Sequence, residues 1–197
     1  MEAAWAIYGI GFLIFFGVAG YMILTHQEDT PHEPLNVEHI VTELTVRSPA
    51  FPHEETIPSK YTCDGENLSP PLAIDDIPEG TASLVLIMED PDSPNGTWDH
   101  WVMFNMPANT DRVGEGDAPK GTSGKNTWGA AEYGGPCPHD GEHRYVFNVY
   151  ALDTSLRLFE GTPKEEVLEA MKGHILAKGE LMGRYERQQM QVLPEQE

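Results

Sequence analysis

Basic residues are scarce in this chain. It has 12 lysines and arginines against 32 aspartates and glutamates, which gives a formal net charge of −20. Proteins that bind DNA or RNA neutralise phosphates with clustered Lys and Arg, and the sequence contains no such cluster. The composition therefore argues against a nucleic-acid partner, and the acidity is most simply a solubility property.

Cysteine is also rare. The two cysteines, Cys63 and Cys137, are too few for a disulfide scaffold, and neither belongs to a Cys-x-x-Cys pair. A chain of 197 residues can bury a core of ordinary size without a disulfide or a metal. The sequence leaves two states of these cysteines open. They form one disulfide if the domain lies in an oxidising compartment, or they remain two part-buried thiols.

Charged residues are missing from residues 3–24, AAWAIYGIGFLIFFGVAGYMIL. An apolar helix of about 20 residues spans a bilayer, so we predict a single-pass transmembrane anchor over residues 1–25. A signal peptide would need a basic start and a cleavage site, and a buried core helix is seldom apolar on every side. Lys and Arg are absent near both ends, so their distribution leaves the orientation open. From common architectures we expect the domain outside the cytoplasm.

The remaining chain divides by composition. Residues 26–43 are polar and predict a linker, residues 44–187 predict the folded domain, and residues 188–197 predict a polar tail. The 19 glycines and 16 prolines favour a turn-rich, mostly β fold. No metal or cofactor is expected from the motifs.

Several stretches predict secondary structure. The apolar run 84–88 predicts a buried strand, and strict alternation predicts strands from Trp98 and from His143. The first alternation places four side chains on one face, namely Trp98, His100, Val102 and Phe104. Thr162-Pro163-Lys164-Glu165 predicts a capping box and a helix, and residues 174–187 predict a second short helical or irregular segment. The Gly-rich residues 107–129 predict a long surface loop, of a kind that is often functional.

Polar side chains at the predicted strand ends form the candidate site. They are Asp90, Asp92, His100 and His143, with Trp98 and Tyr145 beside them. Imidazoles, a hydroxyl and loop amides suit a phosphate or carboxylate ligand. A zinc site lacks a His-x-His or His-x-x-x-His pair, and the loop after Asp90 lacks the bidentate Glu of a calcium loop. Hydrolysis lacks a G-x-S-x-G motif, although Cys137 precedes His143 closely. Ordinary turn residues are the fourth interpretation.

Taken together, the motifs resemble the phosphatidylethanolamine-binding protein family, in its bacterial and archaeal Raf kinase inhibitor-like branch. The resemblance rests on two long motifs in order and on shorter marks of the branch: residues 90–94 with 98–101, residues 135–136 with 143–145, and residues 61–65, 69–71, 133–138 and 173–176. It spans roughly residues 46–187.

The resemblance implies an antiparallel β-sandwich with a few short helices and a small pocket for phosphate or phosphorylethanolamine-like groups. Carried over by position, the ligand-binding residues are Asp90, Trp98, His100, Pro136, His143 and Tyr145. We expect three further residues at the pocket rim, Asp92, Cys137 and His139, of which His139 replaces the second proline usual in the branch. The implied histidines donate to the anion, and binding is expected to be tighter near pH 6 than near pH 8.

The predicted function is therefore a membrane-tethered binding protein for a small anionic ligand, with possible regulation of an unknown protein partner. No catalytic residue is predicted. The alternative is a hydrolase or a hydrolase inhibitor that uses the same pocket.

Overall fold

The computed structural model describes residues 42–187, which form two β-sheets, one α-helix and a short 3-10 helix. The strands are β1 (Thr42–Glu43), β2 (Thr45–Arg47), β3 (Leu72–Asp75), β4 (Ser83–Asp90), β5 (Trp98–Pro107), β6 (Arg112–Val113), β7 (Thr122–Ser123), β8 (Glu142–Leu152) and β9 (Ile175–Glu186). The helices are η1 (Ser59–Tyr61) and α1 (Lys164–Met171).

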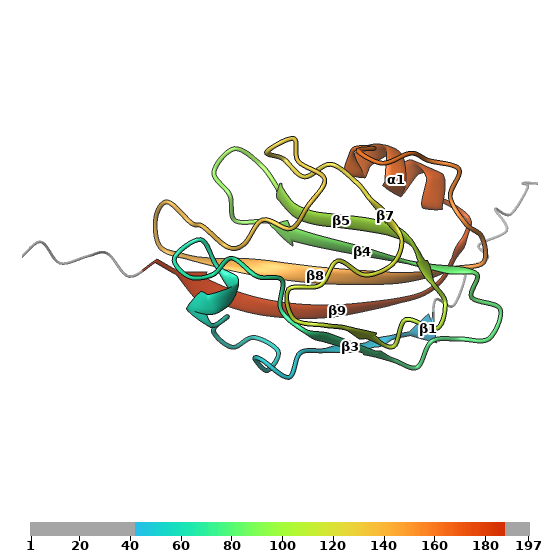
Figure 1. Cartoon of the computed structure of the whole chain (residues 1–197), viewed down its shortest axis with the longest axis horizontal. Coiled ribbons are helices and arrows are strands. Elements are labelled where there is room, and N and C mark those ends of the chain that lie inside the picture. The colour runs from blue at the N-terminus through green and yellow to red at the C-terminus, as the bar shows by residue number, and fades with distance from the viewer. Residues whose placement is uncertain (1–41, 188–197) are drawn as a thin grey trace, which may run out of the picture. The chain divides into compact units, whose positions relative to one another are not determined.

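The larger sheet has the strand order β1-β9-β8-β4-β5-β7, and the smaller sheet has the order β2-β3-β6. All pairs are antiparallel except β1 with β9. Figure 1 shows the four long strands β5, β4, β8 and β9 side by side. The central strand β4 therefore pairs with its neighbour in sequence, β5, and with the distant strand β8.

The main hydrophobic core fills the space between the two sheets. Val46 and Ile74 enter it from the small sheet, and Leu86 and Phe147 enter it from the large sheet. These side chains alternate along their strands with residues of the opposite face, as period-two geometry requires. The predicted antiparallel β-sandwich is confirmed for residues 42–187.

The predicted helix is present as α1 and covers the other face of the large sheet. Its buried residues Val167 and Met171 pack in a second core with Phe104. The capping box is not formed, because the hydroxyl of Thr162 donates to the carbonyl of Phe159 and no side chain caps the helix. Packing against the sheet therefore fixes this helix more than its N-terminal capping does.

The predicted helical or irregular segment over residues 174–187 was wrong, because this segment forms β9. The structural reason is a pair of glycines. A Cβ at Gly179 would lie 2.4 Å from the Leu44 carbonyl oxygen, and one at Gly183 would lie 2.5 Å from Ile57. The glycines let these neighbours pack directly on the strand backbone, and this spacing was not recognised as a strand pattern.

The fold-class prediction needs a second correction, which concerns the membrane. Among residues 42–187 no helix is long and apolar enough to cross a bilayer. The predicted anchor over residues 1–25 lies outside the described residues, as do the tail at 188–197 and nearly all of the linker at 26–43. The structure therefore supports the mostly β domain without the membrane helix that was predicted to precede it.

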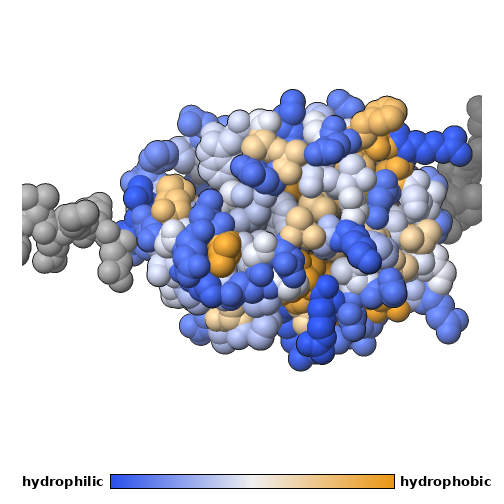
Figure 2. Space-filling view, in the orientation of Figure 1, coloured by the Kyte–Doolittle hydropathy of each residue, from blue (hydrophilic) through white to orange (hydrophobic). Residues whose placement is uncertain are grey.

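The surface of the domain is mostly polar. Figure 2 shows a face on which hydrophilic residues dominate and hydrophobic ones are scattered. Three large hydrophobic side chains are exposed within the described chain, namely Trp128, Phe159 and Leu168.

Candidate functional site

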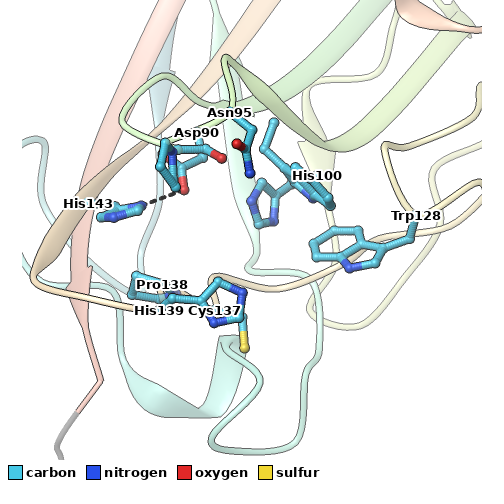
Figure 3. A pocket seen from close by; sticks show the side chains of 11 residues that line it. Asp90, Asn95, His100, Trp128, Cys137, Pro138, His139 and His143 are labelled. Atoms are coloured by element: carbon cyan, nitrogen blue, oxygen red, sulfur yellow. Dashed lines mark hydrogen bonds and ion pairs between the residues drawn. The ribbon is translucent and has the colours of Figure 1, made fainter.

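A cavity of about 320 Å³ lies where β4 ends and where β5 and β8 begin. Its walls come from these strand ends and from two loops, which connect β4 to β5 and β7 to β8. The lining residues are Asp90, Ser93, Pro94, Asn95, Trp98, His100, Trp128, Cys137, Pro138, His139 and His143. Figure 3 shows Asp90 and His143 on one side, Trp128 on the other, and His100 between them. Four of the six predicted ligand-binding residues therefore share one cavity.

A β-bulge in β5 shapes this end of the sheet. Met88 pairs with Trp101, and the next residue, Glu89, pairs with Asp99. His100 is thus an extra residue that has no partner on β4. Bulges of this kind often lie next to functional sites, where they change the direction of a side chain.

The bulge overturns the predicted arrangement of faces on β5. The alternation placed Trp98, His100, Val102 and Phe104 together. In the structure Val102 and Phe104 pack in the core beneath α1, while Trp98 and His100 line the cavity with Asp90. One inserted residue reverses the face of everything that follows it.

Asp90 and His143 form the most closely bonded pair of the cavity. The Nδ1 atom of His143 lies 2.8 Å from Oδ2 of Asp90, and both residues are buried. The other carboxylate oxygen, Oδ1, accepts the backbone N–H of Asp92 at 2.9 Å. A carboxylate only accepts, so His143 carries a proton on Nδ1 and its Nε2 atom remains free for a ligand.

His100 is held by the backbone. Its Nδ1 atom lies 2.7 Å from the carbonyl oxygen of Gly134 and donates to it. Burial lowers the pKa of His100 and outweighs the opposing effects of the Gly134 carbonyl and Asp90, so the ring is neutral at pH 7. In this form its Nε2 atom is an acceptor, which differs from the donor that the family resemblance implied.

Aromatic rings support His100 from two sides. The ring of Trp128 meets it edge to face at a centroid distance of 5.0 Å, and the ring of Tyr145 does so at 5.2 Å. Trp128 also meets Trp98 edge to face at 5.4 Å. The orientation of the imidazole is therefore fixed by ring packing in addition to its hydrogen bond.

Tyr145 and Pro136, which the resemblance placed in the pocket, are not lining residues. Tyr145 is fully buried under His100, and burial raises its pKa. Its hydroxyl and the indole N–H of Trp98 have no hydrogen-bond partner among residues 42–187. Two buried donors without a partner at hydrogen-bond distance thus lie beside the cavity, and Asp90 is near enough to the Tyr145 hydroxyl to raise its pKa further. Pro136 offers its carbonyl oxygen to the backbone N–H of Cys63.

Two of the three predicted rim residues, Cys137 and His139, line the cavity. Asp92 does not, because it accepts three hydrogen bonds from the next strand, one from the Arg144 backbone and two from its guanidinium group. These bonds lower the pKa of Asp92 to about 2. Arg144 is thereby paired with Asp92, and neither residue lines the cavity.

Cys137 is joined to Cys63 in a disulfide, with their Cα atoms 5.5 Å apart. The sequence had left this pairing open. The bond fastens the cavity wall at residues 137–139 to the loop that follows η1. It also occupies the thiol that the hydrolase alternative considered as a nucleophile, because a disulfide sulfur is not a thiolate.

Sequence reasoning missed five lining residues, which are Ser93, Pro94, Asn95, Trp128 and Pro138. A partial signal for Trp128 was present, because it lies in the long Gly-rich loop. A Cβ at Gly134 would come within 2.5 Å of the Trp128 ring. Gly134, which belongs to the branch mark over residues 133–138, therefore makes room for a tryptophan that neither long motif contains.

Metal chemistry finds no support in the described part of the chain, where no three His, Cys, Asp or Glu side chains are arranged as metal ligands. The one buried carboxylate of the cavity, Asp90, is already bonded through both oxygens.

The fold and the cavity define a class: a two-sheet β-sandwich with a polar pocket at one end of its large sheet. The family model described as phosphatidylethanolamine-binding protein matches residues 47–186. The chain belongs to this family, as the motifs indicated.

Relatives and solved structures agree. A UPF0098 protein of Methanothermobacter thermautotrophicus is 48% identical over 150 residues, which cover 73% of this chain and 99% of the relative. A putative phosphatidylethanolamine-binding protein homologue from Chlamydia trachomatis is 45% identical, with a TM-score of 0.72 over 75% of this chain and 99% of the other. YbcL of Escherichia coli, described as a new member of the mammalian family, is 29% identical, with a TM-score of 0.69 over 75% of this chain and 100% of the other.

Proposed function

We propose that this protein binds a small ligand with a phosphoryl group in the cavity between Asp90, His100 and His143. The observation that carries the proposal is the buried Asp90–His143 pair, whose 2.8 Å hydrogen bond leaves Nε2 of His143 free. When Nε2 also carries a proton, the imidazolium donates to a phosphoryl oxygen while Asp90 balances its charge.

The second histidine complements the first. Neutral His100 has an acceptor at Nε2, so it suits a hydroxyl or ammonium hydrogen on the ligand. One donor and one acceptor together favour a singly protonated phosphate, or a phosphoryl group with a donor nearby. The unpartnered N–H of Trp98 offers a further donor beside the cavity.

The size of the cavity limits the ligand. At about 320 Å³ it lies at the lower end of ordinary small-molecule sites. The names of the Chlamydia and Escherichia coli structures support a ligand of the phosphorylethanolamine kind. We therefore expect a headgroup-sized ligand.

Calorimetry with the purified full chain tests this proposal, with inorganic phosphate and phosphorylethanolamine as probes near pH 6 and pH 8. Both probes share the phosphoryl group, and tighter binding of the second assigns the ammonium end to the site as well. We expect at least one probe to bind, and to bind more tightly at the lower pH, where more of the phosphoryl group is singly protonated.

One variant tests the role of His143, and a second variant serves as its control. His143→Ala should weaken binding by about tenfold or more, since a hydrogen bond to a charged group contributes about 1.5–3 kcal/mol. The control is His174→Ala. His174 also bonds an aspartate, Asp153, at 2.7 Å, but it is exposed and does not line the cavity. Absence of binding heat with both probes, or equal affinity in the His143→Ala variant, would overturn the proposal.

A further inference from the structure

A cluster of buried charges lies on the face of the large sheet that α1 covers. Lys164, the first residue of α1, bonds Glu89 on β4 at 2.7 Å and Asp99 on β5. The side chains of Lys164 and Asp99 are 10% and 11% exposed. Charges this deeply buried are costly unless each is paired.

The two carboxylates have a special position in the sequence. Glu89 directly precedes Asp90, and Asp99 directly precedes His100. Because successive residues of a strand point to opposite faces, the carboxylates lie beneath the sheet while their neighbours line the cavity. Lys164 therefore bonds the backbone segments that present two of the cavity's polar groups.

Lys164 also relieves a repulsion at the bulge. Glu89 and Asp99 are directly opposite each other across β4 and β5, immediately after the register shift between Met88 and Glu89. Like charges in that position destabilise a strand pair. Burial raises the pKa of Asp99, against the effect of Lys164. Burial alone would lower the pKa of Lys164, and the bonds to Asp99 and Glu89 more than compensate, so the pKa is raised and the lysine stays charged.

The cluster is also connected, through Thr127, to the loop that carries the lining residue Trp128. The backbone N–H of Asp99 donates to the Thr127 hydroxyl at 2.8 Å, and the N–H of Thr127 donates to the Asp99 carbonyl at 3.0 Å. The next residue is Trp128, whose ring meets His100. Asp99 is therefore bonded to α1 through its side chain and to the Trp128 loop through its backbone.

We propose that Lys164 is a positioning residue for the cavity. Lys164 holds the β5 bulge and the Trp128 loop in place, so that His100 keeps its orientation. The proposal rests on the proposed function for its ligand readout, but the orientation of His100 is measured without ligand. Lys164 itself lies outside the set of residues that line the cavity.

The test replaces the charge and keeps the length, as Lys164→Met in the full chain. Nuclear magnetic resonance of the ¹⁵N-labelled imidazoles reports the His100 tautomer and its bond to Gly134 in the absence of ligand. We expect the His100 signals to shift and broaden, and the affinity for inorganic phosphate to fall by about tenfold among folded molecules. Lys172→Met is the matched control, because Lys172 caps the same helix and pairs with Glu169 on the surface.

A compensated variant separates positioning from general stability. Lys164→Met combined with Glu89→Gln and Asp99→Asn removes the repulsion along with the lysine, and should restore much of the His100 signal and the phosphate affinity. Unchanged His100 signals in a folded Lys164→Met protein would overturn the proposal. Loss of stability alone, with the same affinity per folded molecule, would do so too. If the wild-type chain binds no phosphate, the proposed function fails, while the His100 signals still decide the role of Lys164.

Discussion

Asp90 connects the turn after β4 with the histidine at the start of β8. Its Oδ1 atom closes the turn after β4 by accepting the Asp92 N–H, and its Oδ2 atom orients His143. Both oxygens accept hydrogen bonds within the protein, so in the proposed binding mode Asp90 would act on a ligand mainly through His143. A carboxylate that is buried and accepts a hydrogen bond on each oxygen in this way is suited to holding an imidazole in one tautomer.

The pair of Asp92 and Arg144 gives a pH-dependent prediction. The pKa of Asp92 is lowered to about 2 in the folded protein, chiefly by the Arg144 side chain, against about 3.9 when unfolded. A lowered folded-state pKa means that the pair stabilises the fold above about pH 4 and ceases to do so as the pH falls towards 2. Arg144→Gln should therefore cost at most about 1 kcal/mol of unfolding free energy near pH 6, because the pair is partly exposed.

Urea unfolding of the wild type and of Arg144→Gln at a series of pH values measures this difference. We expect the two stabilities to converge below about pH 3. A difference that stays constant between pH 6 and pH 2 would contradict the assignment of the lowered pKa to Arg144. The backbone bond from residue 144 to Asp92 remains in the variant, so the comparison isolates the guanidinium group.

Residue types predicted some of the side chains that line this cavity. Asp90 and His143 were found because each ends or begins a strand beside a Pro- or Gly-rich loop, and such residues meet at one edge of a sheet. Trp128 and Ser93 were missed because nothing in the spacing of a loop says which of its side chains turns inwards. The unused Tyr145 hydroxyl shows the opposite limit, since alternation gave its face correctly but not its depth below the cavity.

At the level of elements, the β5 bulge marks the point where sequence pattern and structure diverge. The strict alternation from Trp98 predicted one continuous face, and the extra residue at His100 divides that face in two. Periodicity cannot reveal a bulge, because the polarity of the inserted residue depends on its function and does not follow the alternation of the strand. The strand itself, its partner β4 and the helix α1 were all predictable from local patterns.

The disulfide between Cys63 and Cys137 leads to a prediction about the cavity wall. It closes a loop with a sequence separation of 74 residues, and loops of that length correspond to about 4 kcal/mol in the chain-entropy model. Reduction of the wild type should therefore lower the urea midpoint markedly. It should also weaken phosphate binding, because Cys137 lines the cavity.

The double variant Cys63→Ser with Cys137→Ser serves as the control for this prediction. Its urea midpoint should match that of the reduced wild type and should not respond to dithiothreitol. If reductant leaves the wild-type midpoint unchanged while free thiols are detected by labelling, the bond contributes nothing to stability and the prediction is wrong.

For the molecule as a whole, the charge of −20 is the dominant long-range property. Uncompensated acidic groups repel each other in the compact state, and exposed ion pairs contribute little to offset them. We expect the thermal midpoint to rise as sodium chloride increases from about 10 to 200 mM and then to level off, because the Debye length is already about 8 Å at 0.15 M.

Differential scanning calorimetry measures this effect, with sucrose of equal osmolality as the control for general solvent exclusion. A midpoint that falls or stays level in salt would show that attractive pairs, such as the buried Lys164 cluster, outweigh the net repulsion.

The position of β4 between β5 and β8 has a consequence for the order in which the chain folds. Strand β4, which ends at Asp90, can form a hairpin with β5 early. The partner of Asp90, His143, is 53 residues away in sequence. Closing such a distant contact is slow compared with forming a local hairpin. The cavity is therefore absent from every partly folded form that lacks β8, and a ligand that binds there would stabilise only forms in which β8 has joined β4. Ligand binding in this protein should thus report the docking of β8, during synthesis as well as after dilution from denaturant.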